Sequence, residues 1–485
     1  MSRATHKAEP LTGKNDGSDD TIDEAKASPT GKVVHDLRKK TGRAAVFVPV
    51  LSPGHPIAVK AAASGTLHAP EARLAEALGL AAAIDLEVVA HGFAPLRDIK
   101  PATLIGSGKV EEIKEIVKAG EIELVIIDYP LSPVQQRNLE KALGAKVVDR
   151  TGLILEIFGR RARTAEGKLQ VELANLTYAK SRLVRAWTHL ERQRGGAGFL
   201  GGPGEMQMEL DKRMLQDTID AIKVDLEKVK RTRELHRGGR KQVPYPVVAL
   251  VGYTNAGKST LFNRLTGAGV FAKDLLFATL DPTMREVKLE SGRKLILADT
   301  VGFISELPTM LIAAFRATLE EVLEADIILH VRDIAASESD AQRADVLKVL
   351  TELGIPVEGP DCPILEVWNK ADLIAPERLE ELQHRAGREA QGAMVVSAVT
   401  GAGVPELLAA VDARIGSRDR TLTLDVDASQ GAFLSWLHGN AEVVERTMTD
   451  EGRVRMQLRV DATRRGRLEA RLAAMGASAA NIVET

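Results

Sequence analysis

Cysteine is almost absent from this chain of 485 residues, which contains Cys362 alone. A single cysteine cannot form an intramolecular disulfide or a cysteine-based metal site. Its scarcity is typical of proteins that work in a reducing compartment, so we expect the cytoplasm. Because Cys362 directly precedes an apolar strand pattern at 364–368, we expect it to be a small buried side chain rather than a reactive thiol.

Long apolar runs and a secretory signal pattern are missing as well. The sequence has no stretch of about 18 apolar residues, the length that a transmembrane helix needs. We therefore expect neither secretion nor stable membrane insertion, while weak association with a membrane surface stays open. The net charge of −2 does not favour nucleic-acid binding by the chain as a whole. The length predicts about three or four domains.

A glycine-rich loop is the most informative feature that is present. It follows a short apolar strand (247–251) and precedes a helical run (259–266). In this G-x-x-x-x-G-K-S pattern the backbone N–H groups can face a polyphosphate, Lys258 can place its charge at the β- and γ-phosphates, and Ser259 can ligate Mg²⁺. An ordinary strand-to-helix turn is the alternative, which the flanking elements disfavour. The loop residues are Gly252, Tyr253, Thr254, Asn255, Ala256, Gly257, Lys258 and Ser259.

A second motif ends a predicted hairpin whose strands are 286–290 and 294–298. It consists of Asp299, Thr300, Val301 and Gly302. Asp299 would lie beside Ser259 and hold Mg²⁺ through water, and the Gly302 N–H could reach a γ-phosphate because no Cβ obstructs it.

Two further motifs predict recognition of guanine. The first, after the apolar strand 364–368, is Asn369, Lys370, Ala371 and Asp372. The Asp372 carboxylate can accept hydrogen bonds from guanine N1–H and N2–H₂, a donor pair that adenine lacks. The second motif follows strand 394–396, and its backbone can contact guanine O6; it is Ser397, Ala398 and Val399. These motifs, in this order along the chain, together predict binding of GTP and GDP.

The alternation of short apolar strands with helical runs predicts a doubly wound α/β domain with the Ras-like order of motifs. The expected strands are 247–251, 295–299, 326–331, 364–368 and 394–397. In such sheets ligands bind at the carboxyl ends of the strands, where these motifs fall.

A threonine between 273 and 285 should be the second protein ligand of the metal, and Thr279 and Thr283 both qualify chemically. The run around Thr279 is Phe277, Ala278, Thr279, Leu280 and Asp281. Together with the phosphate loop and the run 299–303, it resembles the HflX family of ribosome-associated GTPases, over residues of about 40 to 485. The resemblance implies that Thr279 is the Mg²⁺ ligand and senses the γ-phosphate. Lys258, Thr279 and Gly302 are then the expected catalytic residues.

Position 303 departs from a Ras-like enzyme. A glutamine that orients the attacking water often follows the glycine of this motif, but Phe303 has no hydrogen-bonding atom. Our hypothesis is slow hydrolysis that depends on a partner. The alternative is that Phe303 packs in the core and another side chain orients the water.

The regions around this domain have their own patterns. Residues 1–32 are polar and predict a disordered tail, and 33–160 alternates strands and helices as a small parallel α/β domain. Within it, the turn 106–109 (Gly-Ser-Gly-Lys) opens a helix and could bind an anion, although a tight structural turn explains it better. The nucleotide-binding domain should span 245–418, and 421–485 a small α/β domain with an apolar and a basic strand face.

Residues 161–241 predict two long amphipathic helices packed antiparallel, because apolar residues recur at helical spacing. The apolar positions are Leu169, Leu173, Leu176, Leu183, Trp187, Leu190, Leu215, Ile219, Ile222, Leu226 and Val229.

The connection between these helices, 195–204, is longer than an antiparallel turn needs and contains six glycines. Residues 150–241 contain 20 Lys and Arg against 12 Asp and Glu, an excess that suits phosphate contacts. We expect the tip to enter an RNA crevice, with Phe199 stacking on a base. The resemblance implies that it reaches the peptidyl-transferase centre of the large ribosomal subunit. A solvated spacer is the alternative.

The sequence as a whole predicts a monomeric, cytoplasmic, Mg²⁺-dependent GTP hydrolase that binds the 50S ribosomal subunit and its rRNA. In its GTP state it would split or rescue stalled ribosomes. Two other classes stay open. One is an RNA-remodelling ATPase or helicase that uses the N-terminal domain, and the other is a passive rRNA-binding factor.

Overall fold

The computed structural model describes residues 42–193, 203–240, 245–267, 276–277, 279–280, 282–306, 316–388, 392–416, 419–449, 452–475 and 480–483. The tail predicted for 1–32 and most of the predicted hairpin tip (195–202) lie outside these residues. None of the described helices is long and apolar enough to cross a membrane.

The N-terminal sheet has four parallel strands in the order β2-β1-β3-β4. They are β1 (Arg43–Leu51), β2 (Glu87–Leu96), β3 (Leu124–Ile127) and β4 (Lys146–Asp149). The helices are α1 (Pro56–Ala63), α2 (Pro70–Ala82), α3 (Ser107–Ala119), α4 (Pro133–Leu143) and α5 (Arg150–Arg161). Helices α3 and α4 fill one face of the sheet together with alternate strand residues such as Phe47 and Ile127. The sequence did not predict α5 because buried residues surround most of it and leave no single apolar stripe.

Side-chain caps define where two of these helices begin. In α4, Ser132 Oγ accepts from the Gln135 N–H at 3.2 Å, and Gln135 Oε1 accepts from the Ser132 N–H at 2.9 Å, which makes a capping box. In α5, Asp149 Oδ1 accepts from the Gly152 N–H at 2.8 Å. This second cap makes Arg150 the first residue of α5, where its side chain is buried.

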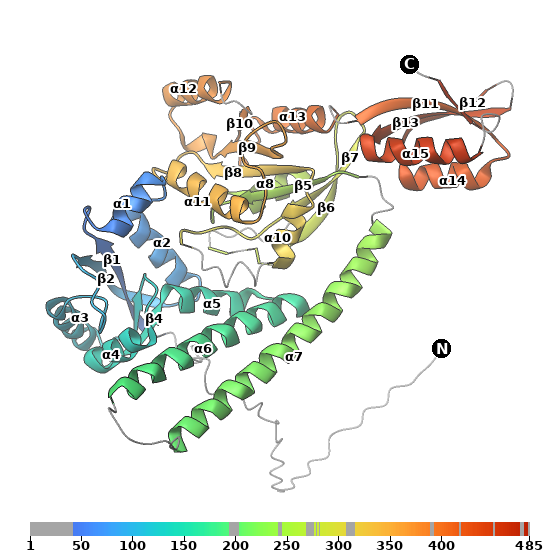
Figure 1. Cartoon of the computed structure of the whole chain (residues 1–485). Helices are drawn as coiled ribbons and strands as arrows, with labels where there is room; N and C mark the ends of the chain where they lie inside the picture. The colour runs from blue at the N-terminus through green and yellow to red at the C-terminus, as the bar shows by residue number, and fades with distance from the viewer. Residues whose placement is uncertain are drawn as a thin grey trace, which may run out of the picture. The chain divides into compact units, whose positions relative to one another are not determined.

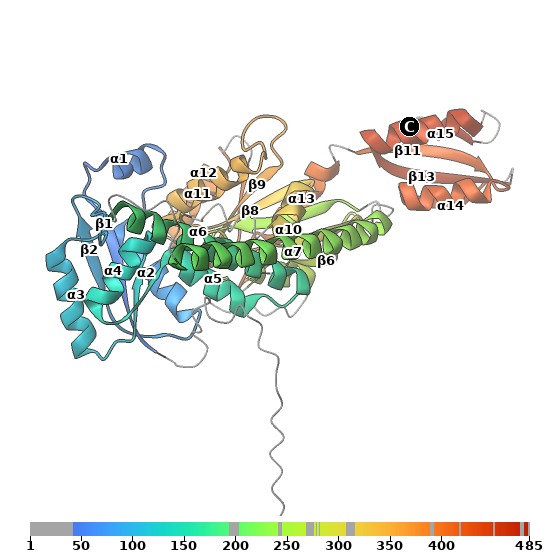
Figure 2. The ribbon, with the colours of Figure 1, turned by 60° about the horizontal axis from the view of Figure 1, so that its bottom comes forward.

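Two long helices follow, α6 (Ala165–Gln193) and α7 (Pro203–Arg240), and lie side by side (Figures 1 and 2). Their apolar faces meet in a small core. Its members are Leu169, Leu173, Leu176, Leu183, Leu215, Ile219, Ile222 and Leu226. The amphipathic pattern in the sequence therefore predicted the packing face. The side chains of Trp187 and Leu190 lie outside the described residues.

The central sheet has six strands in the order β10-β9-β8-β5-β7-β6, and only β6 is antiparallel to its neighbour. The strands are β5 (Val247–Gly252), β6 (Thr283–Lys288), β7 (Lys294–Asp299), β8 (Ile327–Asp333), β9 (Ile364–Asn369) and β10 (Ala393–Val395). The helices are α8 (Lys258–Thr266), α10 (Arg316–Leu323), α11 (Ser339–Glu352), η2 (Ala371–Leu373), α12 (Pro376–Ala386) and α13 (Val404–Gly416).

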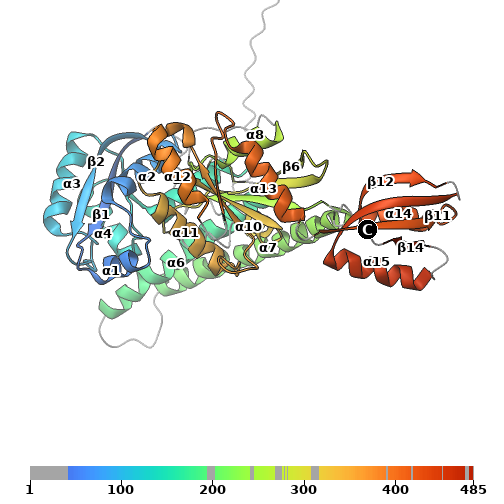
Figure 3. The ribbon, with the colours of Figure 1, turned by 90° about the horizontal axis from the view of Figure 1, so that it is seen from above.

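Both faces of this sheet are covered (Figure 3). Helices α8 and α13 share a core with Val367, whereas α12 packs against the next residue of the same strand, Trp368. Because successive strand residues point to opposite faces, α12 lies on the face opposite α8 and α13. This arrangement confirms the predicted doubly wound α/β fold.

The C-terminal sheet is antiparallel, in the order β12-β13-β11-β14. Its strands are β11 (Asp419–Asp427), β12 (Glu442–Met448), β13 (Arg453–Asp461) and β14 (Ala480–Val483), and its helices are α14 (Gly431–Asn440) and α15 (Ala462–Met475). Both helices lie on the same side of the strands (Figure 1) and share their core. The short β14 was not predicted, since four residues are too few to show a period.

Candidate functional site

The loop between β5 and α8 is shaped by glycines. Gly257 has φ +90°, and a Cβ there would overlap the Asn369 side chain. Only glycine fits this position without displacing its neighbour. The loop thus takes its conformation at the carboxyl end of the central strand β5, where α/β sheets bind ligands.

Lys258 is buried at the start of α8. Its Nζ donates to Gly252 O at 3.0 Å and to Tyr253 O at 2.7 Å. Burial lowers the pKa of Lys258 to about 8, and the nearby charge of Asp299 opposes this shift. A polyphosphate in the loop would favour the charged amine, so nucleotide binding and protonation of Lys258 should be coupled.

Three oxygen atoms converge next to the loop. Ser259 Oγ lies 2.9 Å from Thr279 Oγ1 and 2.8 Å from Asp299 Oδ2, and Thr279 Oγ1 lies 2.9 Å from the same carboxylate oxygen. Among the described residues no group of three His, Cys, Asp or Glu could hold a metal. A cation here would rely on hydroxyl, phosphate and water oxygens, which are the ligands that Mg²⁺ prefers. The three side chains fit that ion.

The pKa of Asp299, the carboxylate in this cluster, depends on its neighbours. Burial raises the pKa of Asp299, whereas Lys258, Ser259 and Thr279 act in the opposite direction. A divalent cation would remove the cost of burying this negative charge. On chemistry alone, either Thr279 or Thr283 qualified as the second metal ligand. The structure brings Thr279 to Ser259.

Residues 302–306, called switch II below, lie directly against the loop. The Thr254 N–H donates to Phe303 O at 2.7 Å, and the Phe303 N–H donates to Gly252 O at 3.1 Å. A Cβ on Gly302 would lie 2.9 Å from Thr254 Cα and 3.1 Å from Lys258 Nζ. Gly302 therefore sits beside the amine that would meet the phosphates. The side chain of Phe303 is buried and cannot orient a water molecule.

The base-recognition motifs meet at the ends of β9 and β10. Asp372 Oδ1 accepts from Ser397 Oγ at 2.5 Å. The buried Asn369 donates to Ala256 O and accepts from the Ala398 N–H, both at 2.9 Å. Asn369 therefore ties the base loop to the phosphate loop, while recognition of guanine by Asp372 stays a prediction.

Some predicted site residues support the site from inside the fold. The buried Thr300 donates to Leu250 O at 2.6 Å, and Val301 and Leu280 are also buried. Val399 is exposed. Ala278 and Asp281 lie outside the described residues.

Sequence reasoning missed two residues that hold the base loops. Arg264 of α8 donates from Nε to Ala398 O at 3.1 Å and from its terminal nitrogen to Val399 O. Asp333, at the end of β8, pairs with Lys370 at 2.8 Å. Asp333 is a charged residue at the end of a strand, and this position was a signal that it belongs to the site. Arg264 lies within a helical pattern that gives no such signal.

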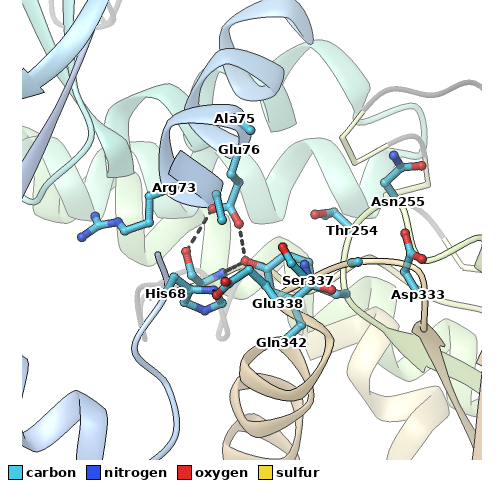
Figure 4. A pocket seen from close by; sticks show the side chains of 14 residues that line it. His68, Arg73, Ala75, Glu76, Thr254, Asn255, Asp333, Ser337, Glu338 and Gln342 are labelled. Atoms are coloured by element: carbon cyan, nitrogen blue, oxygen red, sulfur yellow. Dashed lines mark hydrogen bonds and ion pairs between the residues drawn. The ribbon is translucent and has the colours of Figure 1, made fainter. Parts of the chain in front are cut away.

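A pocket of about 310 Å³ adjoins the phosphate loop on its N-terminal-domain side (Figure 4). Its lining includes Asn255 from the loop, Glu76 from α2 and His68, which precedes α2. The imidazole of His68 contacts Asp345 at 2.7 Å and Glu338 at 3.4 Å, both on the central domain. Burial alone would lower the pKa of His68, but these carboxylates outweigh burial and raise it.

Family models match nearly the whole described chain. Their descriptions are GTP-binding GTPase N-terminal (residues 71–159), GTP-binding GTPase Middle Region (161–240), 50S ribosome-binding GTPase (247–370) and HflX C-terminal domain (381–481).

Curated relatives and one solved structure are similar to this chain. GTPase HflX of Magnetococcus marinus is 50% identical over 380 residues, which cover 78% of this chain and 86% of that protein. GTPase HflX of Escherichia coli K12 is 46% identical over 363 residues, with 74% and 83% covered. A GTP-binding protein of Sulfolobus solfataricus, solved with GDP, is 24% identical with a TM-score of 0.40 and covers 77% of this chain and 98% of that one.

The lowered pKa of Lys258 predicts that the protein takes up protons when it binds GDP at high pH. In the free protein at about pH 9 a lysine with a pKa near 8 is mostly neutral, so binding of GDP should take up close to one proton (~0.9). Calorimetry in buffers of different ionisation enthalpy measures this number. At about pH 7 Lys258 is already charged and its share of the uptake should vanish. Equal proton uptake at both pH values would contradict the assignment.

The position of Asp372 predicts a change of base specificity. Asp372→Asn replaces an acceptor by an amide that can donate to the O2 of xanthine. We expect GTP affinity to fall by roughly one to two orders of magnitude and XTP affinity to rise. Titration with fluorescent analogues of both nucleotides measures this, with ATP as a control that should bind neither protein. Unchanged GTP affinity in the folded variant would refute the role of Asp372, and ATP binding would favour the ATPase class.

Proposed function

Because this chain belongs to the HflX family of ribosome-associated GTPases, we propose that it binds the large (50S) ribosomal subunit in its GTP state and splits stalled ribosomes. Family membership makes it a GTP hydrolase. The observation that carries the proposal is the convergence of Ser259, Thr279 and Asp299 in a chain that also has a long helical hairpin.

The proposed chemistry is attack of water on the γ-phosphate, which releases GDP and phosphate. Lys258 stabilises negative charge on the transferred group, and the Gly302 N–H donates to its oxygens. Ser259 and Thr279 would hold Mg²⁺ directly, and Asp299 would hold it through water. When bound, Mg²⁺ neutralises phosphate charge.

The proposed mechanical link is the ordering of two loops by the terminal phosphate. GTP would order the segments that contain Thr279 and Gly302 and so fix the orientation of the hairpin of α6 and α7. Hydrolysis would release both segments. In the GTP state the tip at 195–204 would enter an rRNA crevice, which the excess of basic residues over 150–241 supports.

The proposed setting is the cytoplasm, with the protein acting as a monomer. The N-terminal turn at 106–109, where Lys109 pairs with Glu112 at 2.6 Å, is a structural turn in this proposal and not a second nucleotide site. An RNA-remodelling ATPase and a passive rRNA-binding factor are the alternative functions, and nucleotide competition and the Lys258→Ala variant distinguish them from this proposal.

Sedimentation through a sucrose gradient tests the partner. With a non-hydrolysable GTP analogue we expect the protein to move with the large subunit and the peak of intact ribosomes to fall. With GDP or an ATP analogue we expect neither change, because neither supplies both the guanine and a γ-phosphate.

Two variants serve as controls. Lys258→Ala should abolish splitting in a folded protein, and full activity would indicate a passive binding factor. Deletion of 195–204 should leave nucleotide binding intact and remove large-subunit binding. If the shortened protein still binds the large subunit and splits ribosomes, the proposed role of the tip is wrong.

Because Phe303 is buried and has no hydrogen-bonding atom, we expect slow hydrolysis in isolation; the alternative is that another side chain orients the water. Large subunits should accelerate single-turnover hydrolysis by roughly tenfold or more, because a partner must then position the water or reshape switch II. Thr279→Ala, which removes a proposed metal ligand, sets the inactive baseline. A fast rate without ribosomes would show that another group of this chain orients the water.

A further inference from the structure

Phe303 cannot orient the attacking water, and its position is fixed. Its side chain is only 1% exposed. Its N–H donates to Gly252 O, and its O accepts from the Thr254 N–H. The residue therefore cannot turn away from the phosphate loop without breaking both hydrogen bonds. A water-orienting group within this chain must lie elsewhere.

Several hydroxyl groups beside the phosphate loop already have partners. Ser305 Oγ accepts from Arg150 at 2.8 Å. The Tyr253 hydroxyl accepts from the Ser305 N–H at 2.7 Å and donates to Glu76. Thr300 Oγ1 donates to a main-chain oxygen of β5 at 2.6 Å. The hydroxyls of the two proposed metal ligands are bonded within their own cluster. Each of these groups is therefore turned toward a protein partner.

The Thr254 hydroxyl differs from these groups. Thr254 is 7% exposed, and among the described residues its buried Oγ1 has no hydrogen-bond partner. The Asp299 carboxylate, which would hold Mg²⁺ through water, has one oxygen in the same condition. Most buried polar atoms are paired, and an unpaired one needs an explanation such as a bound water, an ion or a catalytic role. The hydroxyl therefore indicates a ligand that binds beside the phosphate loop.

The Thr254 side chain lies where the γ-phosphate is expected. A Cβ on Gly302 would lie 2.8 Å from Thr254 Cγ2 and 3.1 Å from Lys258 Nζ. Lys258 and Gly302 are the two residues proposed above to bind the γ-phosphate, so the Thr254 side chain adjoins both. Because Oγ1 and Cγ2 of Thr254 are bonded to the same carbon, the hydroxyl lies in the same place.

The same side chain borders a space that can contain water. Thr254 lines the pocket beside the phosphate loop (Figure 4), and the volume of about 310 Å³ is several times what one water molecule needs. The side chain therefore adjoins both a space for water and the residues that would hold the phosphate.

We propose that Thr254 is a catalytic residue, whose hydroxyl orients the water that attacks the γ-phosphate of GTP. Thr254 Oγ1 accepts a hydrogen bond from this water, which is the part that a glutamine often has in Ras-like enzymes. This role rests on the γ-phosphate position proposed above. It places the water-orienting group in the phosphate loop instead of switch II, and any acceleration by ribosomes adds to it.

The reaction needs no acid or base from Thr254. The water oxygen bonds to the γ-phosphorus while the bond from this phosphorus to the bridging oxygen of GDP breaks. Both protons of the water leave on the inorganic phosphate, and Thr254 keeps its own proton. The hydroxyl therefore contributes orientation alone, which raises the rate without strengthening the binding of GTP.

Thr254→Val tests this role, because valine keeps the shape of threonine and lacks the hydroxyl. We expect single-turnover hydrolysis at saturating GTP, without ribosomes, to slow roughly tenfold through loss of one hydrogen bond to the attacking water. Affinities for GDP and for a non-hydrolysable GTP analogue should stay within about twofold, because the lost bond acts in the reaction. Release of labelled phosphate measures the rate, and titration with fluorescent analogues measures the affinities.

The thermal stability of the free variant gives a second readout. Among the described residues the hydroxyl has no partner, so replacing it by a methyl group should leave the unfolding temperature unchanged or raise it. A residue with a purely structural hydroxyl would lose stability in the same experiment.

Two further variants separate the hydroxyl from general effects of substitution. Thr254→Ser keeps the hydroxyl, and its rate should stay within about threefold of the unmodified protein, the difference reflecting the freer χ1 of serine. Thr351→Val removes a hydroxyl of the same domain that donates to Leu347 O within α11 at 2.8 Å. Its hydrolysis rate should not change.

Two results would overturn the role of Thr254. An unchanged rate in Thr254→Val would show that the hydroxyl does not act on the water. Equal losses of rate and of GTP-analogue affinity, with GDP affinity unchanged, would show that it binds the γ-phosphate instead. Should Thr254→Val not fold, Thr254→Ala takes its place in the comparison with Thr254→Ser.

The variants of the proposed metal and phosphate ligands show which idea has failed. If Lys258→Ala and Thr279→Ala also hydrolyse GTP at the unmodified rate, the proposed chemistry as a whole is wrong. If they lose activity and Thr254→Val does not, only the role of Thr254 is wrong.

Discussion

The close approach of switch II to the phosphate loop is the constraint on which the rest of the site depends. The backbones of Thr254 and Phe303 are hydrogen bonded at 2.7 Å, and Gly302 leaves no room for a side chain beside Lys258. A single added carbon would separate the two segments. Lys258, the phosphate loop and Gly302 therefore form one packed unit. A substitution in one of them displaces the others.

The base end of the site belongs to the same unit. Asn369 bonds to Ala256 in the phosphate loop and to Ala398 in the base loop, so it fixes the distance between the parts of the site that would hold phosphate and guanine. Arg264, from the helix that follows the phosphate loop, holds the same base loop from the other side. The loops predicted to hold guanine and phosphate are thus joined by shared hydrogen bonds.

The junction between β4 and α5 places two neighbouring residues in contact with different parts of the molecule. Arg150 bonds to switch II, and Asp149 accepts from the Tyr178 hydroxyl on α6 at 2.5 Å. Arg182, also on α6, pairs with Asp149 at 3.4 Å. The strand end that holds switch II also anchors the first helix of the hairpin. In the proposed mechanism, this junction is the contact between switch II and the hairpin.

The sequence by itself determined the phosphate loop, the order of the motifs and the doubly wound fold, because local glycine spacing and apolar periodicity specify them without distant contacts. The family was indicated separately, by the resemblance of the motif residues. The sequence also predicted the faces on which α6 and α7 pack. Only the tertiary structure placed Thr279 beside Ser259, assigned Asn369 to an internal link, and brought Glu76 and Arg150 to residues more than 150 positions away in the chain. Such pairings arise from how separate sheets and helices pack, and no short pattern encodes them.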